Sequence, residues 1–305
     1  MNSRKTIWML WMLGGMVLTG LTACSGDDDA TDVADDGVKV RRITITQTED
    51  AAARQMMTRA SLTEGDGLTA SWTAGDGLMY CNLSRMNGGD VYSGGLTAAS
   101  TAAASQFTGD VACRAGDYLA VVYPATTFTR NDTYTITLSG QDGTLGGLAT
   151  NYHYVYGKAT VTAVTDATAD ATMEKMKSLL TVCKFSFVDK TSGDAVPVKT
   201  LSISYGGTGS DAGKYPQTAT VTLNSDGILE QAAVHATGVA GSTALTVTCP
   251  TAQGAVYVAL LPTTAQRTFR FTVSDGSGNT YSGTAKATLT EGEYVEATGL
   301  RLTKQ

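Results

Sequence analysis

The sequence predicts an all-β protein, and three observations support this fold class. The chain of 305 residues contains 49 Thr and 34 Gly; β-branched residues favour strands, and glycine is common in turns. Short apolar segments alternate with polar residues along most of the chain and are separated by turn signals. No helical stretch is long enough to serve as a crossover, so we expect antiparallel sheets packed as sandwiches.

The first predicted strand opens the folded part of the chain. Arg41 and Arg42 interrupt its alternation by one residue, which predicts a β-bulge. Residues 48–60 lack alternation and are expected to form a loop or a short helix. The apolar positions of this first strand are Val38, Val40, Ile43 and Ile45.

Two groups of later strands follow, separated by a polar, mildly helical segment over residues 166–177. This change places a domain boundary near residue 172. We therefore expect two β-sandwich domains, residues 38–172 and 173–305. The clearest predicted strands are 118–123, 134–138, 152–156 and 159–164 in the first, and 179–188, 201–205, 218–223, 245–248, 256–261, 269–273, 281–289 and 294–302 in the second.

The N-terminus has the pattern of a secretory signal. Arg4 and Lys5 precede an uncharged apolar run over Ile7–Leu21, which is too short for a full bilayer span. The run ends in Leu-Thr-Ala-Cys24, which resembles a bacterial lipobox. This resemblance implies that residues 1–23 are removed and that acyl chains on Cys24 anchor the protein to a membrane.

Residues 24–37 form an acidic segment without bulky apolar residues, which predicts a solvated tether. Its start resembles the surface-export signal of Bacteroidota lipoproteins, which implies a place on the outer face of the outer membrane. Removal of Arg4 and Lys5 leaves 20 basic against 28 acidic residues, a net charge of -8. The residues that would form the export signal are Ser25, Gly26, Asp27, Asp28 and Asp29.

Several classes of function are disfavoured by composition. Binding to nucleic acid depends on cationic side chains, and this chain is acidic. His153 and His235 are the two histidines, and neither has companions at the spacing of a metal site or a catalytic triad, so both are expected to be structural. We therefore predict no enzyme activity, no catalytic residue, no metal and no cofactor.

Four cysteines lie in the predicted domains, two in each, without CxxC spacing. These cysteines can take either of two states. Outside the cytoplasm they can form a disulfide bridge within each domain, or they can stay free thiols that pack in the core as small apolar side chains. Buried thiols are slightly favoured, because one of the four alternates as a core residue. The cysteines are Cys81, Cys113, Cys183 and Cys249.

A loose set of motifs across the mature chain resembles the fimbrillin family, the subunits and accessory proteins of type V pili. These motifs include Trp72 before a Gly-Asp turn, Tyr123-Pro124 after a strand, residues 256–262 (VYVALLP) and Glu291-Gly-Glu-Tyr294 before the last strand. The resemblance implies two transthyretin-like sandwich domains. It also implies export as a lipoprotein and a location in fimbriae at the outer membrane.

The resemblance further implies assembly by strand exchange. An Arg-specific protease cuts after the first strand, and a strand from another pilus subunit fills the open groove by β-augmentation. In this chain the removable strand would be Val38–Thr46, and the cut would follow Arg59 or, less favoured, Arg54. Three residues follow Leu302, so no spare donor strand is evident, although the last strand itself could peel away. Stalk, tip, anchor and minor subunits stay open.

An alternative is a monomeric surface lipoprotein that binds glycans or other host or bacterial surface ligands. Trp72 would then stack on sugar rings together with a row of tyrosines. The competing interpretation places these aromatics in the sheet core, which is common for aromatic residues in strands. The tyrosines of the row are Tyr152, Tyr154 and Tyr156.

Overall fold

The computed structural model describes residues 37–47, 61–65, 68–85, 92–126, 133–174, 176–223, 233–237 and 243–305. Residues 37–305 form one compact unit. Some predictions fall outside the described residues and stay predictions. These concern the signal peptide, Cys24, residues 25–29, Arg54 and Arg59.

Strands make up 59% of the structure and helices 5%, which confirms the predicted all-β class. The described residues include one α-helix, α1 (Leu145–Asn151), and one 3-10 helix, η1 (Leu83–Arg85). Thr144 caps the N-terminus of α1, because its Oγ1 accepts a hydrogen bond of 2.9 Å from the backbone N–H of Gly147.

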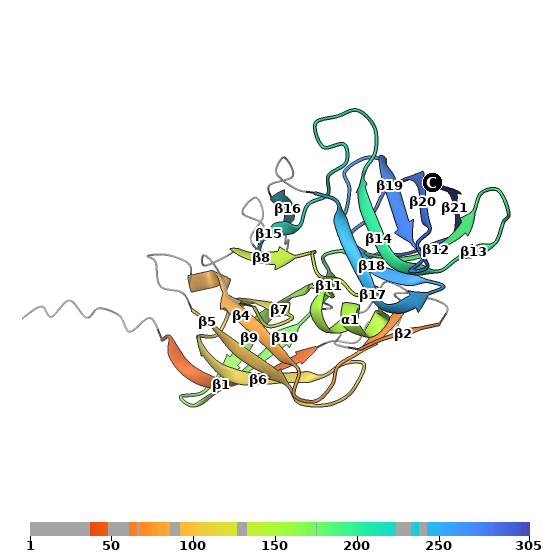
Figure 1. Cartoon of the computed structure of the whole chain (residues 1–305). Coiled ribbons are helices and arrows are strands. Elements are labelled where there is room, and N and C mark those ends of the chain that lie inside the picture. Colours follow the sequence, from red (N-terminus) through yellow and green to blue (C-terminus); the bar gives the residue numbers. More distant parts are fainter. Residues whose placement is uncertain are drawn as a thin grey trace, which may run out of the picture. The chain divides into compact units, whose positions relative to one another are not determined.

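The first large sheet has the strand order β10-β1-β6-β5-β4-β7-β9-β11 (Figure 1). Strand β9 also pairs with β10, so all of these strands except β11 close into a ring. Closure leaves few strand edges without a partner. The strands are β1 (Lys39–Gln47), β4 (Gly77–Asn82), β5 (Ser93–Ala98), β6 (Gln106–Cys113), β7 (Tyr118–Tyr123), β9 (Val155–Val164), β10 (Thr168–Met173) and β11 (Lys177–Ser178).

The core of this ring is centred on Trp72, which is fully buried. Its indole makes edge-to-face contacts with Phe107 and Tyr123, at ring-centroid distances of 4.9 and 5.5 Å. Ile43 and Ile45 of β1 belong to the same cluster and are also fully buried. Strand β1 therefore supplies part of the core as well as two hydrogen-bond ladders.

The predicted bulge in β1 is wrong. Strand β1 pairs with β6 without a register shift, from Lys39↔Cys113 to Thr46↔Gln106. The buried positions alternate without interruption through Arg41, Ile43, Ile45 and Gln47, and Val40 is 69% exposed. The prediction failed because it placed Val40 inside, whereas Arg41 occupies the inward position and finds acceptors there.

The second large sheet has the order β13-β12-β21-β20-β19-β14-β17, with β18 beside β12 (Figure 1). Phe185, Phe187 and Phe271 pack against one another in its core, at centroid distances of 5.2 to 6.2 Å. The strands are β12 (Thr181–Asp189), β13 (Ala195–Val196), β14 (Val198–Tyr205), β17 (Leu245–Gln253), β18 (Val256–Leu260), β19 (Arg267–Ser274), β20 (Thr280–Ala287) and β21 (Tyr294–Lys304).

The expectation of wholly antiparallel sheets is wrong at two places. Strand β1 is parallel to β10, and β12 is parallel to β21. In each pair the strands are separated by about a hundred residues of chain or more, which contain other strands. That length lets the chain return to the same end of the sheet, so no helical crossover is required.

Two smaller sheets complete the fold. Strands β2 (Ser61–Glu64) and β3 (Leu68–Ser71) form a hairpin, and β8 (Thr133–Thr137) pairs with β15 (Thr218–Thr222), which pairs with β16 (Ala233–Thr237). Strands β8 and β15 lie on opposite sides of the predicted domain boundary at residue 172. That boundary, and the transthyretin-like character of each domain, stay predictions.

The described residues of the segment 166–177 are not helical. Half of the segment forms β10, in which Ala169, Ala171 and Met173 are buried at alternate positions. This alternation was missed in the sequence because the prediction relied on bulky apolar residues, and two of the three buried residues are alanines.

Gly109 of β6, which pairs with Ile43 of β1, provides a test of the packing of β6 against β5. A Cβ at Gly109 would clash with the backbone oxygen of Gly95 in β5. We expect Gly109→Ala to lower the free energy of unfolding by about 1–3 kcal/mol, measured by urea denaturation. The matched control is Gly95→Ala, whose Cβ would meet no atom within 4 Å. Equal effects of the two substitutions would contradict the packing described here.

Candidate functional site

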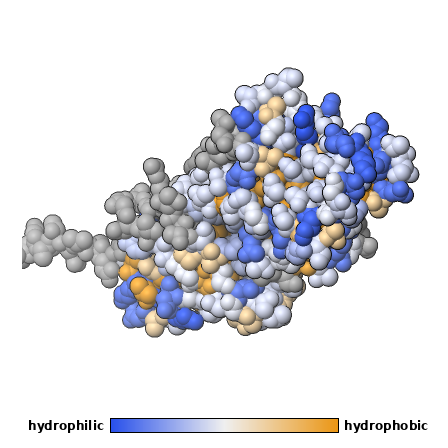
Figure 2. All heavy atoms as spheres, in the orientation of Figure 1, coloured by the Kyte–Doolittle hydropathy of each residue, from blue (hydrophilic) through white to orange (hydrophobic). Residues whose placement is uncertain are grey.

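The predicted exchangeable strand is β1, and the structure places it inside the first sheet. On one side it is antiparallel to β6, and on the other it is parallel to β10 from Arg42↔Thr168 to Gln47↔Met173. Val38 is half-buried and Val40 exposed, and Figure 2 shows hydrophobic residues at the surface at this end of the molecule. Removal of β1 would leave two sheet edges without partners and uncover apolar core.

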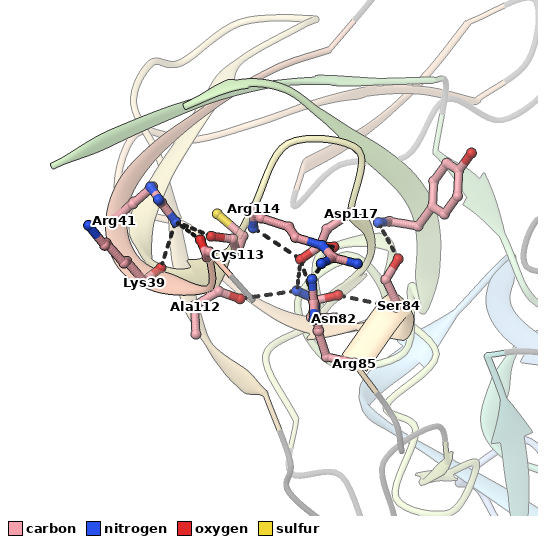
Figure 3. Close-up of polar contacts among 11 residues, drawn as sticks. Lys39, Arg41, Asn82, Ser84, Arg85, Ala112, Cys113, Arg114 and Asp117 are labelled. Atoms are coloured by element: carbon pink, nitrogen blue, oxygen red, sulfur yellow. Dashed lines mark hydrogen bonds and ion pairs between the residues drawn. The ribbon is translucent and has the colours of Figure 1, made fainter. Parts of the chain in front are cut away.

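Arg41 fastens the start of β1 to the segments on both sides of it, and Figure 3 shows its contact with Cys113 on the β6 side. The residue is 5% exposed. Its Nε donates to the Thr165 carbonyl at 2.6 Å, and its Nη1 donates to the carbonyls of Gly37 and Lys39 at 3.2 and 3.3 Å. Nη1 also donates to the Cys113 carbonyl at the end of β6. Thr165 lies in the turn between β9 and β10. One guanidinium therefore binds the chain on both sides of β1, at the end of β6 and just before β10.

A second polar cluster, centred on Asp117, fixes the end of β6 (Figure 3). Asp117 is 2% exposed and accepts hydrogen bonds from Asn82 Nδ2 at 2.9 Å and from Arg85 Nε at 3.2 Å. Asn82 Nδ2 also donates to the Ala112 carbonyl at 3.0 Å. The Asp117 cluster therefore holds the strand end that presents the Cys113 carbonyl to Arg41.

The role of Arg41 can be separated from that of its neighbour Arg42. Arg42 has a side chain that is 60% exposed and lies 3.5 Å from Asp110, the geometry of a weak surface ion pair. We expect Arg41→Ala to lower the free energy of unfolding by about 2–3 kcal/mol, because buried carbonyls lose a charged donor. Arg42→Ala should change it by less than about 0.5 kcal/mol. Urea denaturation of both variants, followed by Trp72 fluorescence, measures the difference; similar losses in both would contradict the assignment.

The predicted sugar-stacking platform does not exist as proposed. Trp72 is fully buried, and the exposed fractions of Tyr152, Tyr154 and Tyr156 are 9% or less. These aromatics belong to the two hydrophobic core clusters, Trp72 to one and the three tyrosines to the other. The predicted strand over residues 152–156 starts only at Val155, so Tyr156 is the one tyrosine of the row that lies in a strand. His153 is also buried, and the backbone of His235 pairs with Thr220 in the small sheet.

The four cysteines of the folded part are buried and unbridged, which agrees with the favoured prediction of buried thiols. Burial raises the pKa of the Cys183 thiol to about 12. Within the described residues no cluster of three or more His, Cys, Asp or Glu side chains is placed to hold a metal ion. The described helices also include none of the length and hydrophobicity needed to span a membrane.

Strand β21 has the same kind of setting in the second sheet as β1 has in the first. It is parallel to β12 on one side and antiparallel to β20 on the other. Its described pairing with β20 is confined to Tyr281↔Lys304 and Ser282↔Thr303, whereas β20 pairs with β19 along its whole length. We call the remaining boundary between β20 and β21 the open seam.

A cavity of about 220 Å³ lies at the open seam. Small side chains border it on both strands, including Ala285 and Ala287 on β20 and Ala297 on β21, and the rings of Phe185 and Phe271 also line it. Side chains that line a cavity make fewer dispersion contacts than side chains in a close-packed core. Strand β21 is therefore held less firmly here than a strand that pairs with its neighbour along its whole length.

Glu64, at the end of β2, contacts three strands of the second sheet. Its carboxylate accepts hydrogen bonds from Lys184 of β12 and from the Tyr257 hydroxyl of β18. The Tyr294 hydroxyl of β21 lies 3.1 Å from Glu64 Oε1 and 3.2 Å from Glu296 Oε1. Nothing in the sequence points to this Glu64 cluster, because its members lie far apart along the chain.

These contacts shift the pKa values of Glu64, Tyr257 and Tyr294. The hydrogen bond from Lys184, and next that from Tyr257, lower the pKa of Glu64 below its ordinary value of 4.5. Burial, followed by the hydrogen bond to Glu64, raises the pKa of Tyr257 to about 12. The same causes raise the pKa of Tyr294. At neutral pH the cluster therefore consists of a carboxylate, an ammonium and two neutral phenols.

The lowered pKa of Glu64 predicts a pH dependence of stability. Its contribution is complete above the pKa of the unfolded chain and is lost as the pH falls through the lower pKa of the folded chain. We expect wild type to lose more stability than Glu64→Gln between about pH 6 and about pH 3, by less than about 1 kcal/mol, because the carboxylate is partly exposed. Urea unfolding at both pH values gives the comparison, and parallel pH profiles would contradict it.

Comparisons with known proteins show likeness in structure alone. No family model matches the chain, and no curated protein matches its sequence. A proposed cell adhesion protein from Bacteroides uniformis shares 17% identity over 89% of this chain and 97% of its own, with a TM-score of 0.49. A similar protein from Bacteroides ovatus shares 10% over 88% and 96%, with a TM-score of 0.48.

The shaft pilin SpaA from Lactobacillus rhamnosus GG shares 9% identity over 88% of this chain and 98% of its own, with a TM-score of 0.32. Because the TM-scores lie below 0.5, the proposals below rest on the contacts of this chain itself.

Proposed function

We propose that this chain is a surface-exposed pilus subunit, with a structural or adhesive role, that assembles by protease-triggered strand exchange. The observation that carries the proposal is the equivalent setting of β1 and β21. Each lies between one parallel and one antiparallel neighbour, so the backbone groups of one strand suit the place of the other.

The side chains of the two strands agree with this equivalence. On β1, Ile43 and Ile45 point into the core two residues apart. On β21, Leu300 and Leu302 have the same spacing and pack into the core of the second sheet. A strand that fills the place of β1 must bury apolar side chains with this period of two.

The sequence of events follows from these settings. A cut after Arg59, or after Arg54, separates β1 from β2, and departure of β1 opens the groove between β6 and β10. Strand β21 of another subunit, loosened along its open seam, enters the groove and restores both ladders. Exchange of one strand for another conserves most hydrogen bonds, so the net driving force comes from side-chain burial and strand length.

The anchoring part of the proposal rests on the N-terminal sequence. Acylated Cys24 would hold the protein in the outer membrane, and Ser25, Gly26 and Asp27 to Asp29 would direct it to the cell surface. The two domains, residues 38–172 and 173–305, would be the transthyretin-like units of the subunit. The burial of Trp72, Tyr152, Tyr154 and Tyr156 removes the stacking platform predicted for the alternative, a monomeric glycan-binding lipoprotein.

Digestion of the mature chain with an arginine-specific protease tests strand exchange. We expect wild type to form multimers that resist unheated detergent, while a variant with Arg54→Gln and Arg59→Gln stays monomeric. A labelled peptide of residues 294–304 should bind the cut chain and cap its growth.

The control peptide carries Leu300→Asn and Leu302→Asn, which remove the apolar period without changing length or charge. It should not bind. A cut chain that has lost β1, stays monomeric and binds neither peptide would overturn the proposed function.

A further inference from the structure

Glu64 lies where the chain after β1 meets the strand proposed as donor. Strand β2 starts at Ser61, two residues after Arg59, and Glu64 is its last residue. Tyr294, which contacts Glu64, is the first residue of β21. One carboxylate therefore connects the segment next to the proposed cut to the strand that is proposed to leave.

The Glu64 cluster is ordered across three adjacent strands. Lys184 is in register with Tyr257 on one side and with Glu296 on the other. The Lys184 ammonium is also 5.9 Å from the centre of the Tyr257 ring. Glu64 joins this row from a separate sheet, so the row does not depend on Glu64 to form.

Lys184 has a second carboxylate in reach if Glu64 departs. Its Nζ lies 3.9 Å from Glu296 Oε1, and the Tyr294 hydroxyl is within hydrogen-bond distance of the same oxygen. Departure of Glu64 thus leaves neither the ammonium nor the phenol without an acceptor. The contact is therefore suited to opening, because Lys184 and Tyr294 both keep Glu296 as an acceptor.

Strand β21 has few other attachments to β20. At its far end it pairs through Ser282↔Thr303 and Tyr281↔Lys304, and the open seam lies between these pairs and Tyr294. Its remaining ladder is the parallel one with β12. The contact with Glu64 is a fastening at the start of the strand, where fraying would otherwise begin.

We propose that Glu64 is a latch that keeps β21 docked until the chain before β2 is cut. The proposal rests on the function proposed above, in which β21 is the exchanged strand. In the intact chain β2 is tethered at both ends. After the cut its covalent attachment is through β3 alone, and the burial of Leu62 is what holds it to the core. A two-stranded hairpin is marginally stable by itself, so Glu64 leaves the cluster more often.

Hydrogen exchange of the intact mature chain, measured on peptides covering residues 294–304, tests the latch. We expect Glu64→Gln and Tyr294→Phe each to raise the exchange rate of β21 amides by about tenfold while β1 amides are unchanged. The matched control, Glu296→Gln, should change it by less than about twofold. Cutting the wild-type chain should raise β21 exchange toward the level of Glu64→Gln.

Two results would overturn the latch: unchanged β21 exchange in both variants, or an equal rise in β1, which signals general destabilisation. Failure of the latch can be told apart from failure of the proposed function. If the cut wild type forms multimers while the variants leave β21 exchange unchanged, the latch alone is wrong. If both variants loosen β21 selectively but the cut chain never associates, the latch holds and strand exchange is wrong.

Discussion

The closed ring of the first sheet depends on β1. This strand joins β6 to β10, so it completes two ladders at once and buries Ile43 and Ile45 against the Trp72 cluster. A sheet edge with unpaired N–H and C=O groups is a template for another strand. The same constraint therefore stabilises the isolated subunit and, once β1 is removed, would create a site that only a strand can fill.

Arg41 helps to fix the register of β1 against its neighbouring strands. A buried guanidinium is costly unless its donors are satisfied, and here the acceptors are carbonyls at the end of β6 and in the turn before β10. A slip of one residue would turn Arg41, Ile43 and Ile45 outward. The Asp117 cluster holds the β6 end rigid, so the strand fits in one position.

In the second sheet, β21 is paired less completely with its two neighbours than β1 is in the first. Strand β21 also lies between a parallel and an antiparallel neighbour, but the open seam and its cavity leave part of it unzipped. Local stability follows the density of buried contacts and hydrogen bonds, so this strand is expected to open before the ring does. A polar contact such as Glu64 with Tyr294 then has more influence on β21 than it would have on a fully paired strand.

The sequence by itself determined the all-β class, many of the strand segments but not β10, and the inward period of Ile43 and Ile45, because these depend on side-chain alternation over a few residues. It misplaced Arg41 and could not identify the partners of Glu64. Alternation specifies which face a residue takes, but not which strand lies beside it. The tertiary structure alone decided that β10 lies parallel to β1 and β21 parallel to β12. It also decided that Glu64 binds Lys184 and Tyr294, which lie 120 or more residues away along the chain. Both results depend on distant segments meeting, because only then do strands find their neighbours and charged groups their partners.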